Sequence, residues 1–146
     1  MSDLTIRQAD EGSVGYVAHL LERADLPTEG VRAHPERFYV ARDEETRVAV
    51  GGLELYERVG LLRSVAVEPS SRGQGYGTQL CDSLERRARE SGVETLYLLT
   101  ETAETFFGER GYEKVEREGV PAAIRETGEF AEVCPSTATV LCKSLR

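Results

Sequence analysis

The segment VAVEPSSRGQGYGTQL, residues 65–80, constrains the fold more than any other part of the chain. Gly73, Gly75 and Gly77 fall within five positions, between an apolar run and a helical pattern. Glycine adopts backbone conformations that other residues avoid, and it lets another group approach the main chain closely. A helix that begins there directs unpaired N–H groups and the positive end of its dipole at one spot, beside Arg72. The segment therefore predicts either a flexible turn or a site for an anion such as a pyrophosphate.

The spacing of the glycines separates the known phosphate-binding patterns. The dinucleotide fingerprint G-x-G-x-x-G fits Gly73 and Gly75, but Thr78 stands where the third glycine is required. A Walker A loop needs a Gly-Lys pair, which the sequence lacks. The remaining pattern is R-x-x-G-x-G, from Arg72 to Gly77. It predicts a cradle for an anion, built from backbone N–H groups.

Strand and helix patterns alternate along the rest of the chain. Periodicity predicts strands at 4–9, 37–42, 46–56, 60–67, 94–100, 112–117 and 138–145. It predicts helices after Asp10, from the glycines to Gly92, and at 103–110 with Thr102 as its cap, and one helical turn within 118–136. The strand at 94–100 is apolar enough to be buried on both faces. The 146 residues are expected to form one α/β (α+β) domain, a mixed sheet with helices on its faces.

Composition narrows the function classes. The chain carries 26 acidic and 18 basic residues, a formal charge of −8, which argues against a nucleic-acid or anionic-membrane partner. No signal peptide or membrane-spanning run is recognisable, so a cytoplasmic protein is expected. Three cysteines and two distant histidines indicate neither a disulfide framework nor a metal site. Only Lys114 and Lys143 among the basic residues are lysines, which suggests either a halophile's acidic surface or an arginine bias in the source.

Two segments resemble the motifs of a known family. VAVEPSSRGQGYGTQL looks like motif A of the GNAT superfamily of acetyl-CoA-dependent N-acetyltransferases, and TFFGERGYEKV resembles motif B. The resemblance implies the GNAT fold, with a mostly antiparallel mixed sheet of about six to seven strands flanked by about four helices. It also implies acetyl-CoA as cosubstrate, no metal and a possible homodimer.

The same resemblance implies a set of site residues. The pyrophosphate of coenzyme A would lie on the backbone of the glycine loop, and its pantetheine arm would pair with the preceding strand. The backbone N–H of Val65 would be the oxyanion donor, and Phe107 stands where relatives often place a tyrosine beside the leaving thiolate. The implied cofactor-binding residues are Val65, Ala66, Val67, Arg72, Gly73, Gln74, Gly75, Tyr76, Gly77, Thr78 and Phe107.

A narrower resemblance concerns the acceptor. Residues from about 61 to 143, above all the tail 118–136, look like the arsenic-resistance N-acetyltransferases, which acetylate the α-amine of glutamate analogues. Such an acceptor carries a carboxylate, and arginine suits bidentate carboxylate binding. Arg63 is one candidate, unless it faces solvent or pairs with Glu54 or Glu57. The tail offers Arg125, Thr127, Glu129 and Phe130 as further candidates for acceptor binding, although Arg125 could be an exposed loop charge.

The general base and acid are not identified. Some relatives place a base glutamate where this chain has Leu61, and the thiolate-side tyrosine is Phe107. Glu54 or Glu57 could act through a water, although a surface position is expected for both, and Tyr112 is expected to be a packed aromatic. A covalent route through Cys134 lacks an activating base nearby. The sequence thus predicts acetyl transfer to a small amino-acid-like amine; the alternatives are another amine (a protein N-terminus, a polyamine or an aminoglycoside) or a non-catalytic acyl-CoA-binding module.

Overall fold

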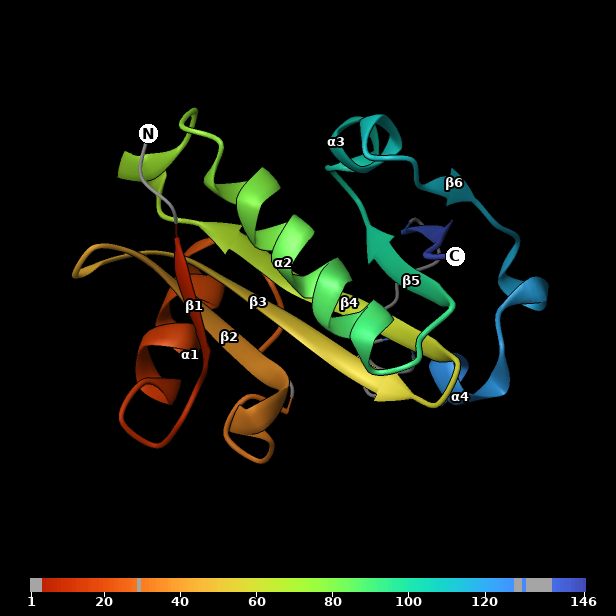
Figure 1. Cartoon of the computed structure of the whole chain (residues 1–146), viewed down its shortest axis with the longest axis horizontal. Coiled ribbons are helices and arrows are strands. Elements are labelled where there is room, and N and C mark those ends of the chain that lie inside the picture. Colours follow the sequence, from red (N-terminus) through yellow and green to blue (C-terminus); the bar gives the residue numbers. More distant parts are fainter. Residues whose placement is uncertain (1–3, 29, 128–129, 131–137) are drawn as a thin grey trace.

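The computed structural model describes residues 4–28, 30–127, 130 and 138–146 (Figure 1). Its elements follow in the order β1 (Thr5–Gln8), α1 (Val14–Arg23), β2 (Phe38–Asp43), β3 (Thr46–Tyr56), β4 (Val59–Val67), α2 (Tyr76–Glu90), β5 (Thr95–Thr100), α3 (Glu104–Glu109), β6 (Glu113–Lys114), α4 (Ala122–Arg125) and β7 (Thr139–Ser144). Short 3₁₀ turns occupy Pro35–Arg37, Pro69–Ser71 and Arg117–Gly119. The predicted order of strands and helices is confirmed.

The described strands form one seven-stranded sheet in the order β1-β2-β3-β4-β5-β7-β6. Every neighbouring pair is antiparallel except β4 and β5, which run parallel. Tight polar turns connect β2 to β3 and β3 to β4, whereas the parallel step from β4 to β5 needs α2 as its crossover. The mixed, mostly antiparallel sheet of the GNAT fold is therefore confirmed.

Helix α2 covers one face of the sheet, as Figure 1 shows. Its apolar stripe is completely buried and consists of Leu80, Cys81, Leu84 and Ala88, as the spacing predicts. The helix lies close to β3 because Gly51 has no side chain: a Cβ there would be 2.9 Å from the Leu84 Cδ1 atom. This contact fixes α2, and with it the glycine loop that precedes it, against the centre of the sheet.

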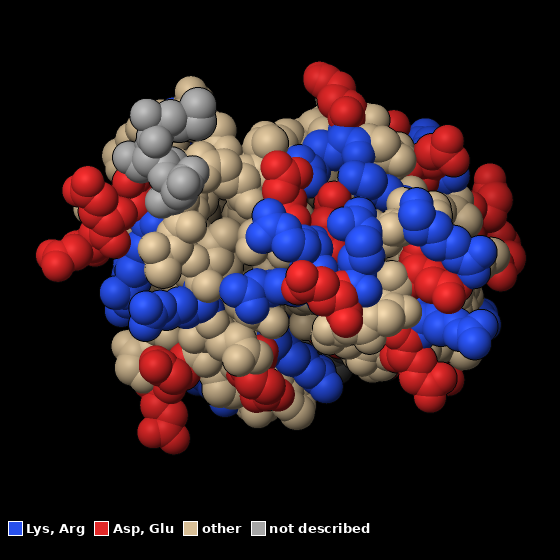
Figure 2. Space-filling view, in the orientation of Figure 1, with Lys and Arg blue, Asp and Glu red and all other residues tan. Residues whose placement is uncertain are grey.

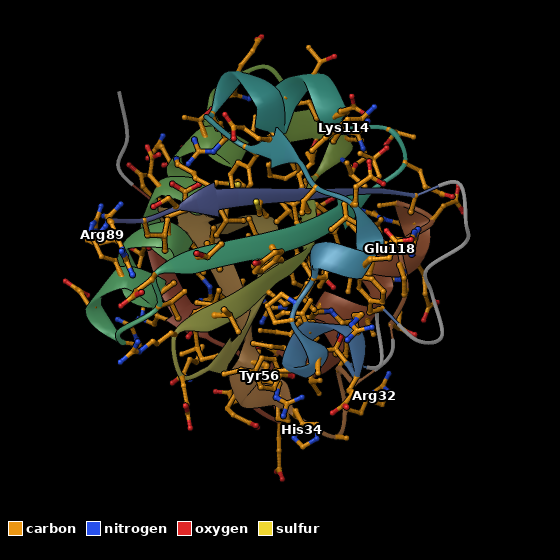
Figure 3. The ribbon with its side chains drawn as sticks, turned by 90° about the vertical axis from the view of Figure 1, so that its right-hand side faces the viewer. Arg32, His34, Tyr56, Arg89, Lys114 and Glu118 are labelled. Atoms are coloured by element: carbon orange, nitrogen blue, oxygen red, sulfur yellow. The ribbon has the colours of Figure 1, made fainter. Side chains whose placement is uncertain are left out.

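Two smaller clusters cover the opposite face. Val17 and Leu21 of α1 pack with Phe38 of β2, and Ile124 of α4 packs with Leu61 of β4. Figure 3 shows the chain running past Lys114 and Glu118 to α4, which lies over the sheet. The face of β4 opposite α2 thus lies between α1 and α4.

Four local predictions are wrong. Ser13, not Asp10, is the N-cap of α1; the Asp10 Oδ1 atom accepts hydrogen bonds from the N–H groups of Gly12 and Ser13 one turn earlier. Ala103 rather than Thr102 caps α3. The strand expected at 112–117 is reduced to two residues, and β5 has alternating burial because its Tyr97 side is only partly covered.

Candidate active site

Strands β4 and β5 part from each other after a short paired stretch. They pair only where Val59–Leu61 meets Thr95–Tyr97, and a cavity of about 900 Å³ lies beyond that point. Residues 62–67 of β4 line one side of it, and residues 98–103 line the other. In the described part of the chain no strand pairs with β4 on this side beyond Leu61, so the edge can pair with an extended ligand.

A β-bulge interrupts β4 at the cavity. Val50 pairs with Ala66 and Gly52 pairs with Arg63, so that Ser64 and Val65 together face Gly51. Ser64 adopts a φ of 59°, a left-handed conformation that costs a residue with a side chain about 1–2 kcal/mol. A bulge leaves one residue out of the ladder and redirects its neighbours. The backbone around Val65, which lines the cavity, is therefore held out of regular pairing with β3.

The glycine loop forms the next part of the site. Gly73 and Gly75 both have a φ of 82°, and Gly75 is the N-cap of α2. A Cβ on either would meet nothing within 4 Å, so these two positions need glycine for backbone conformation and not for space. The first turn of α2 holds no acidic residue. Its N-terminal N–H groups and the neighbouring Arg72, which lines the cavity, suit an anion.

Gly77 has a different role from the other two glycines. It lies inside the first turn of α2 and lines the cavity. A Cβ there would lie 3.6 Å from Val67 Cγ2 and 3.8 Å from Phe106 Cζ. The missing side chain thus keeps the wall of the cavity open between β4 and α3.

The residues predicted to bind the cofactor divide into three groups. Those that line the cavity are Val65, Ala66, Val67, Arg72, Gly77 and Phe107. Gly73, Gln74, Gly75 and Thr78 belong to the loop and the first turn of α2 beside it. The Tyr76 side chain points elsewhere: its ring is in the core and its hydroxyl donates to Asp43, so that only its backbone can serve the site. The positive-φ loop, the helix N-terminus and the open edge of β4 together fit a long ligand with a pyrophosphate.

Arg63 lies at the other end of the cavity and is almost completely buried. Its Nη1 atom donates to Glu54 Oε2 at 2.9 Å, and its Nε donates to Ser64 Oγ at 3.0 Å. The guanidinium lies 5.4 Å from the centre of the Phe38 ring. The Arg63 side chain packs directly against Gly52, where a Cβ would lie only 3.0 Å from Arg63 Cγ. Of the alternatives for Arg63, pairing with Glu54 is confirmed; the same side chain also lines the cavity.

Glu54 is not the surface carboxylate that the sequence predicts. Only 3% of it is exposed, and it lies on β3, paired with Leu61 of β4. Its Oε1 atom accepts a hydrogen bond from the Tyr56 hydroxyl and lies 3.5 Å from Arg37 Nη1. Burial, with the Glu54 carboxylate beside it, raises the pKa of Tyr56 to about 12. Two guanidinium groups and a phenol therefore already contact the Glu54 carboxylate.

Arg125, Thr127 and Phe130, the described tail residues that were predicted to bind the acceptor, do not line this cavity. Arg125 is exposed on α4. Thr127 is buried and serves the local backbone, since its hydroxyl donates to Ile124 O at 2.8 Å and accepts from the Phe130 N–H at 3.2 Å. Phe130 is half-buried, with the Arg117 guanidinium 5.5 Å from its ring centre. Glu129 and Cys134 lie outside the described residues.

A second polar cluster lies behind the cavity, between α2, α3 and β7. Glu85 accepts from Arg110 Nη2 at 2.8 Å, Lys143 Nζ at 2.9 Å and the Tyr112 hydroxyl at 3.0 Å. Tyr112 also packs edge-on against Phe107, and burial beside Glu85 raises its pKa. Tyr112 is thus the packed aromatic that the sequence predicts. Figure 2 shows this face, where Lys and Arg side chains lie among Asp and Glu.

Two segments that line the cavity were not predicted as site residues. The loop Ala24, Asp25, Leu26 and Pro27 follows α1, and Glu101, Thr102, Ala103 and Phe106 follow β5. Only general turn signals mark these segments in the sequence, and it is the pairing of the strands that brings the two segments together.

Among the described residues, no helix could span a membrane and no group of three or more His, Cys, Asp and Glu residues could hold a metal ion.

Comparisons with known proteins agree with this geometry. Residues 6–114 match the model of the acetyltransferase (GNAT) family. The amino-acid acetyltransferase of Ectopseudomonas mendocina is 42% identical over 130 residues, 82% of this chain and 30% of the relative, and that of Edwardsiella ictaluri is 29% identical over 80% of this chain and 28% of the relative. The chain thus spans less than a third of the length of these relatives.

Solved structures share the fold. N-acetylglutamate synthase from Neisseria gonorrhoeae, complexed with coenzyme A and N-acetyl-glutamate, superposes with a TM-score of 0.86 at 22% identity, over 100% of this chain and 36% of that one. Rv2747 from Mycobacterium tuberculosis, in complex with CoA and NLQ, gives 0.79 at 22% identity, over 97% of this chain and 99% of that one. The family model matches most of the chain, and the structure has the parted strands and the glycine loop. The chain therefore belongs to the GNAT acetyltransferase family.

Proposed function

We propose that this protein transfers the acetyl group of acetyl-CoA to the α-amine of a small amino-acid-like acceptor, with glutamate or a glutamate analogue as the first candidate. The observation that carries the proposal is the cavity between β4 and β5, with the glycine loop at one end and the buried Arg63 at the other. The amino-acid acetyltransferases among the relatives and the neighbour that binds N-acetyl-glutamate support the choice of acceptor.

The roles of the residues follow from their positions. The N–H groups at the start of α2 and Arg72 would hold the pyrophosphate, and the open edge of β4 would pair with the pantetheine arm. Acetyl-CoA supplies an activated thioester. The N–H of Val65, which the bulge displaces, would donate to the thioester carbonyl oxygen, where negative charge develops during attack by the amine. Arg63 would bind the acceptor carboxylate in bidentate fashion.

Positioning is expected to supply much of the rate. Holding an amine against a thioester can be worth an effective molarity of about 10⁵ M or more. Phe107 replaces a proton donor beside the thiolate, and Leu61 is buried in an apolar cluster. Neither side chain can move a proton, so the amine must lose its proton to solvent or to another group that lines the cavity.

The proposal is tested by measuring release of CoA thiol. Acetyl-CoA is offered with L-glutamate, phosphinothricin, its arsenical counterpart, the other standard amino acids, polyamines and an aminoglycoside, at low and at high salt. Turnover confined to glutamate and its analogues supports the proposed acceptor. Turnover with cationic amines alone contradicts that acceptor and keeps acetyl transfer, whereas acetyl-CoA binding without any turnover contradicts the enzyme. A single domain, a homodimer, a cytoplasmic location and a halophile's surface remain predictions from the sequence.

A further inference from the structure

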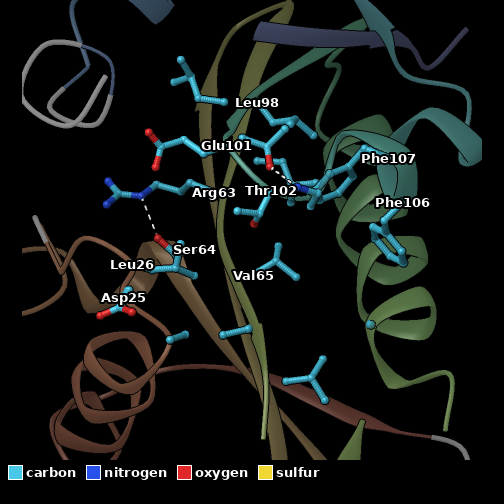
Figure 4. A pocket seen from close by; sticks show the side chains of 18 of the residues that line it. Asp25, Leu26, Arg63, Ser64, Val65, Leu98, Glu101, Thr102, Phe106 and Phe107 are labelled. Carbon is cyan, nitrogen blue, oxygen red and sulfur yellow. Dashed lines mark hydrogen bonds between the residues drawn. The ribbon is translucent and has the colours of Figure 1, made fainter. Parts of the chain in front are cut away.

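Glu101 lies where β5 ends and lines the same cavity as Arg63 of β4. The N–H of Ala103 donates to Thr100 Oγ1 at 2.9 Å, which closes the turn that carries residues 101 and 102. Figure 4 shows the Glu101 carboxylate and the Arg63 guanidinium extending to the same side of β4. The two strands that part to form the cavity therefore each present one charge at the same end of it.

The other charged side chains of the cavity lie in different places. Among the described residues, those that line it with a charge are Asp25, Arg63, Arg72 and Glu101. Arg72 belongs to the glycine loop at the anion-binding end. Asp25 follows α1, and Figure 4 shows it on the far side of Ser64, above the end of that helix. Arg63 and Glu101 are thus the two opposite charges that extend to the same side of β4 (Figure 4).

We propose that Glu101 binds the ammonium group of the acceptor while Arg63 binds its carboxylate, so that the parted strands together recognise an α-amino acid as a zwitterion. The inference rests on the proposed function and assigns a residue to the acceptor's amine. An α-amino acid carries its two charges on one carbon and needs an anion and a cation side by side. A carboxylate accepts the hydrogen bonds of an ammonium group, and such charged bonds are shorter and stronger than neutral ones.

Glu54, the other carboxylate near Arg63, cannot take this role. It is 97% buried, whereas Glu101 is exposed and lines the cavity. Of these two carboxylates, Glu101 is the one that lines the cavity. Glu54 therefore orients the Arg63 guanidinium, and Glu101 binds the acceptor.

The test compares Glu101→Gln with two other carboxylate substitutions. Asp25→Asn removes the competing charge in the same cavity, and asparagine tolerates the φ of 58° at that position. Glu104→Gln removes a charge from the surface of α3, outside the lining. Initial rates are measured with L-glutamate and with 4-aminobutyrate, which has the amine but lacks the α-carboxylate. Glu101→Gln is expected to raise the KM for both acceptors about tenfold, because each loses a charge-assisted hydrogen bond, and to leave the KM for acetyl-CoA within twofold. Arg63→Met is expected to raise only the KM for L-glutamate.

Calorimetry in the presence of CoA separates binding from turnover. Glu101→Gln should weaken binding of L-glutamate about tenfold and leave glutarate, which has no amine, unchanged. An equal effect on glutarate, no effect on either ligand, or a larger effect of Asp25→Asn overturns the assignment of Glu101. If the wild type acetylates L-glutamate and Glu101→Gln does so with the same KM, only the assignment of Glu101 is refuted. A wild type that neither binds nor acetylates L-glutamate refutes both the proposed acceptor and the zwitterion site.

Discussion

Substitution of Gly77 by alanine is expected to raise the stability of the protein and, at the same time, to weaken acetyl-CoA binding. Gly77 has ordinary helical conformation in the first turn of α2, and a Cβ there would make van der Waals contacts at 3.6 Å and 3.8 Å. Alanine is favoured over glycine in a helix by about 0.5–1 kcal/mol. For a chain of this size that gain corresponds to a rise in Tm of about 1–4 °C. The new methyl group projects into the cavity wall between Val67 and Phe106, so the KM for acetyl-CoA should rise severalfold.

Gly75→Ala, two residues earlier, is the matched control with the opposite sign. Its Cβ would meet nothing within 4 Å, so that the whole cost comes from the φ of 82°. An alanine held there loses about 1–2 kcal/mol, which lowers Tm by about 2–8 °C. Thermal unfolding followed by circular dichroism measures both variants, and CoA release gives the KM values. The reasoning is refuted if Gly75→Ala is as stable as the wild type, or if Gly77→Ala melts at a lower temperature.

Three further predictions concern other parts of the molecule. Val65→Pro removes one N–H and should lower kcat about 100-fold while calorimetry still detects acetyl-CoA binding; Val65→Ala keeps the N–H and should stay within a few-fold, and equal losses would contradict the oxyanion role. Glu85→Gln removes the buried carboxylate that pairs with the partly buried Arg110 and Lys143 and should cost about 3–5 kcal/mol in urea unfolding, whereas Asp82→Asn, at an exposed partner of Arg110, should cost under about 1 kcal/mol. Because the pKa of Tyr56 is about 12 when folded and nearer 10 when unfolded, its ionisation favours the unfolded chain, so the free energy of unfolding should fall as pH rises from 10 to 12. Tyr56→Phe should flatten that slope in part, and an unchanged slope would count against the hydrogen bond to Glu54.

The sequence predicted what local signals encode. The order of elements, the end of α2 just before Gly92 and the glycine loop that begins α2 follow from periodicity and from glycine spacing, which act over a few neighbours. The cap of α3 was wrong because Thr100 and Thr102 are both suitable hydroxyls, and only the turn geometry selects between them. The bulge at Ser64 has no sequence signal, since serine rarely adopts a positive φ.

The buried charges could not have been assigned from sequence for a different reason. Glu54 of β3 pairs with Leu61 of β4, but its contacts with Arg37 and Arg63 form only in the folded sheet, and no local pattern predicts them. Arg63 is a clear candidate because it interrupts an apolar run, but its path over Gly52 is a tertiary contact. Glu101 and Asp25 reach one cavity from loops 76 positions apart, and no short-range pattern records that proximity.

The short contact between β4 and β5 also has a mechanical consequence. Among the described residues, three residue pairs join β1–β4 to β5–β7 within the sheet, so those strands form two parts joined along a narrow seam. A ligand that fills the cavity and pairs with β4 would add contacts to both parts of the sheet, because residues of β4 and β5 line the cavity. Its binding energy would then oppose separation of the two parts, and amide hydrogen exchange in β5 and β7 should slow more than in β1 and β2. Ligand binding and the separation of the two parts of the sheet would thus be thermodynamically linked.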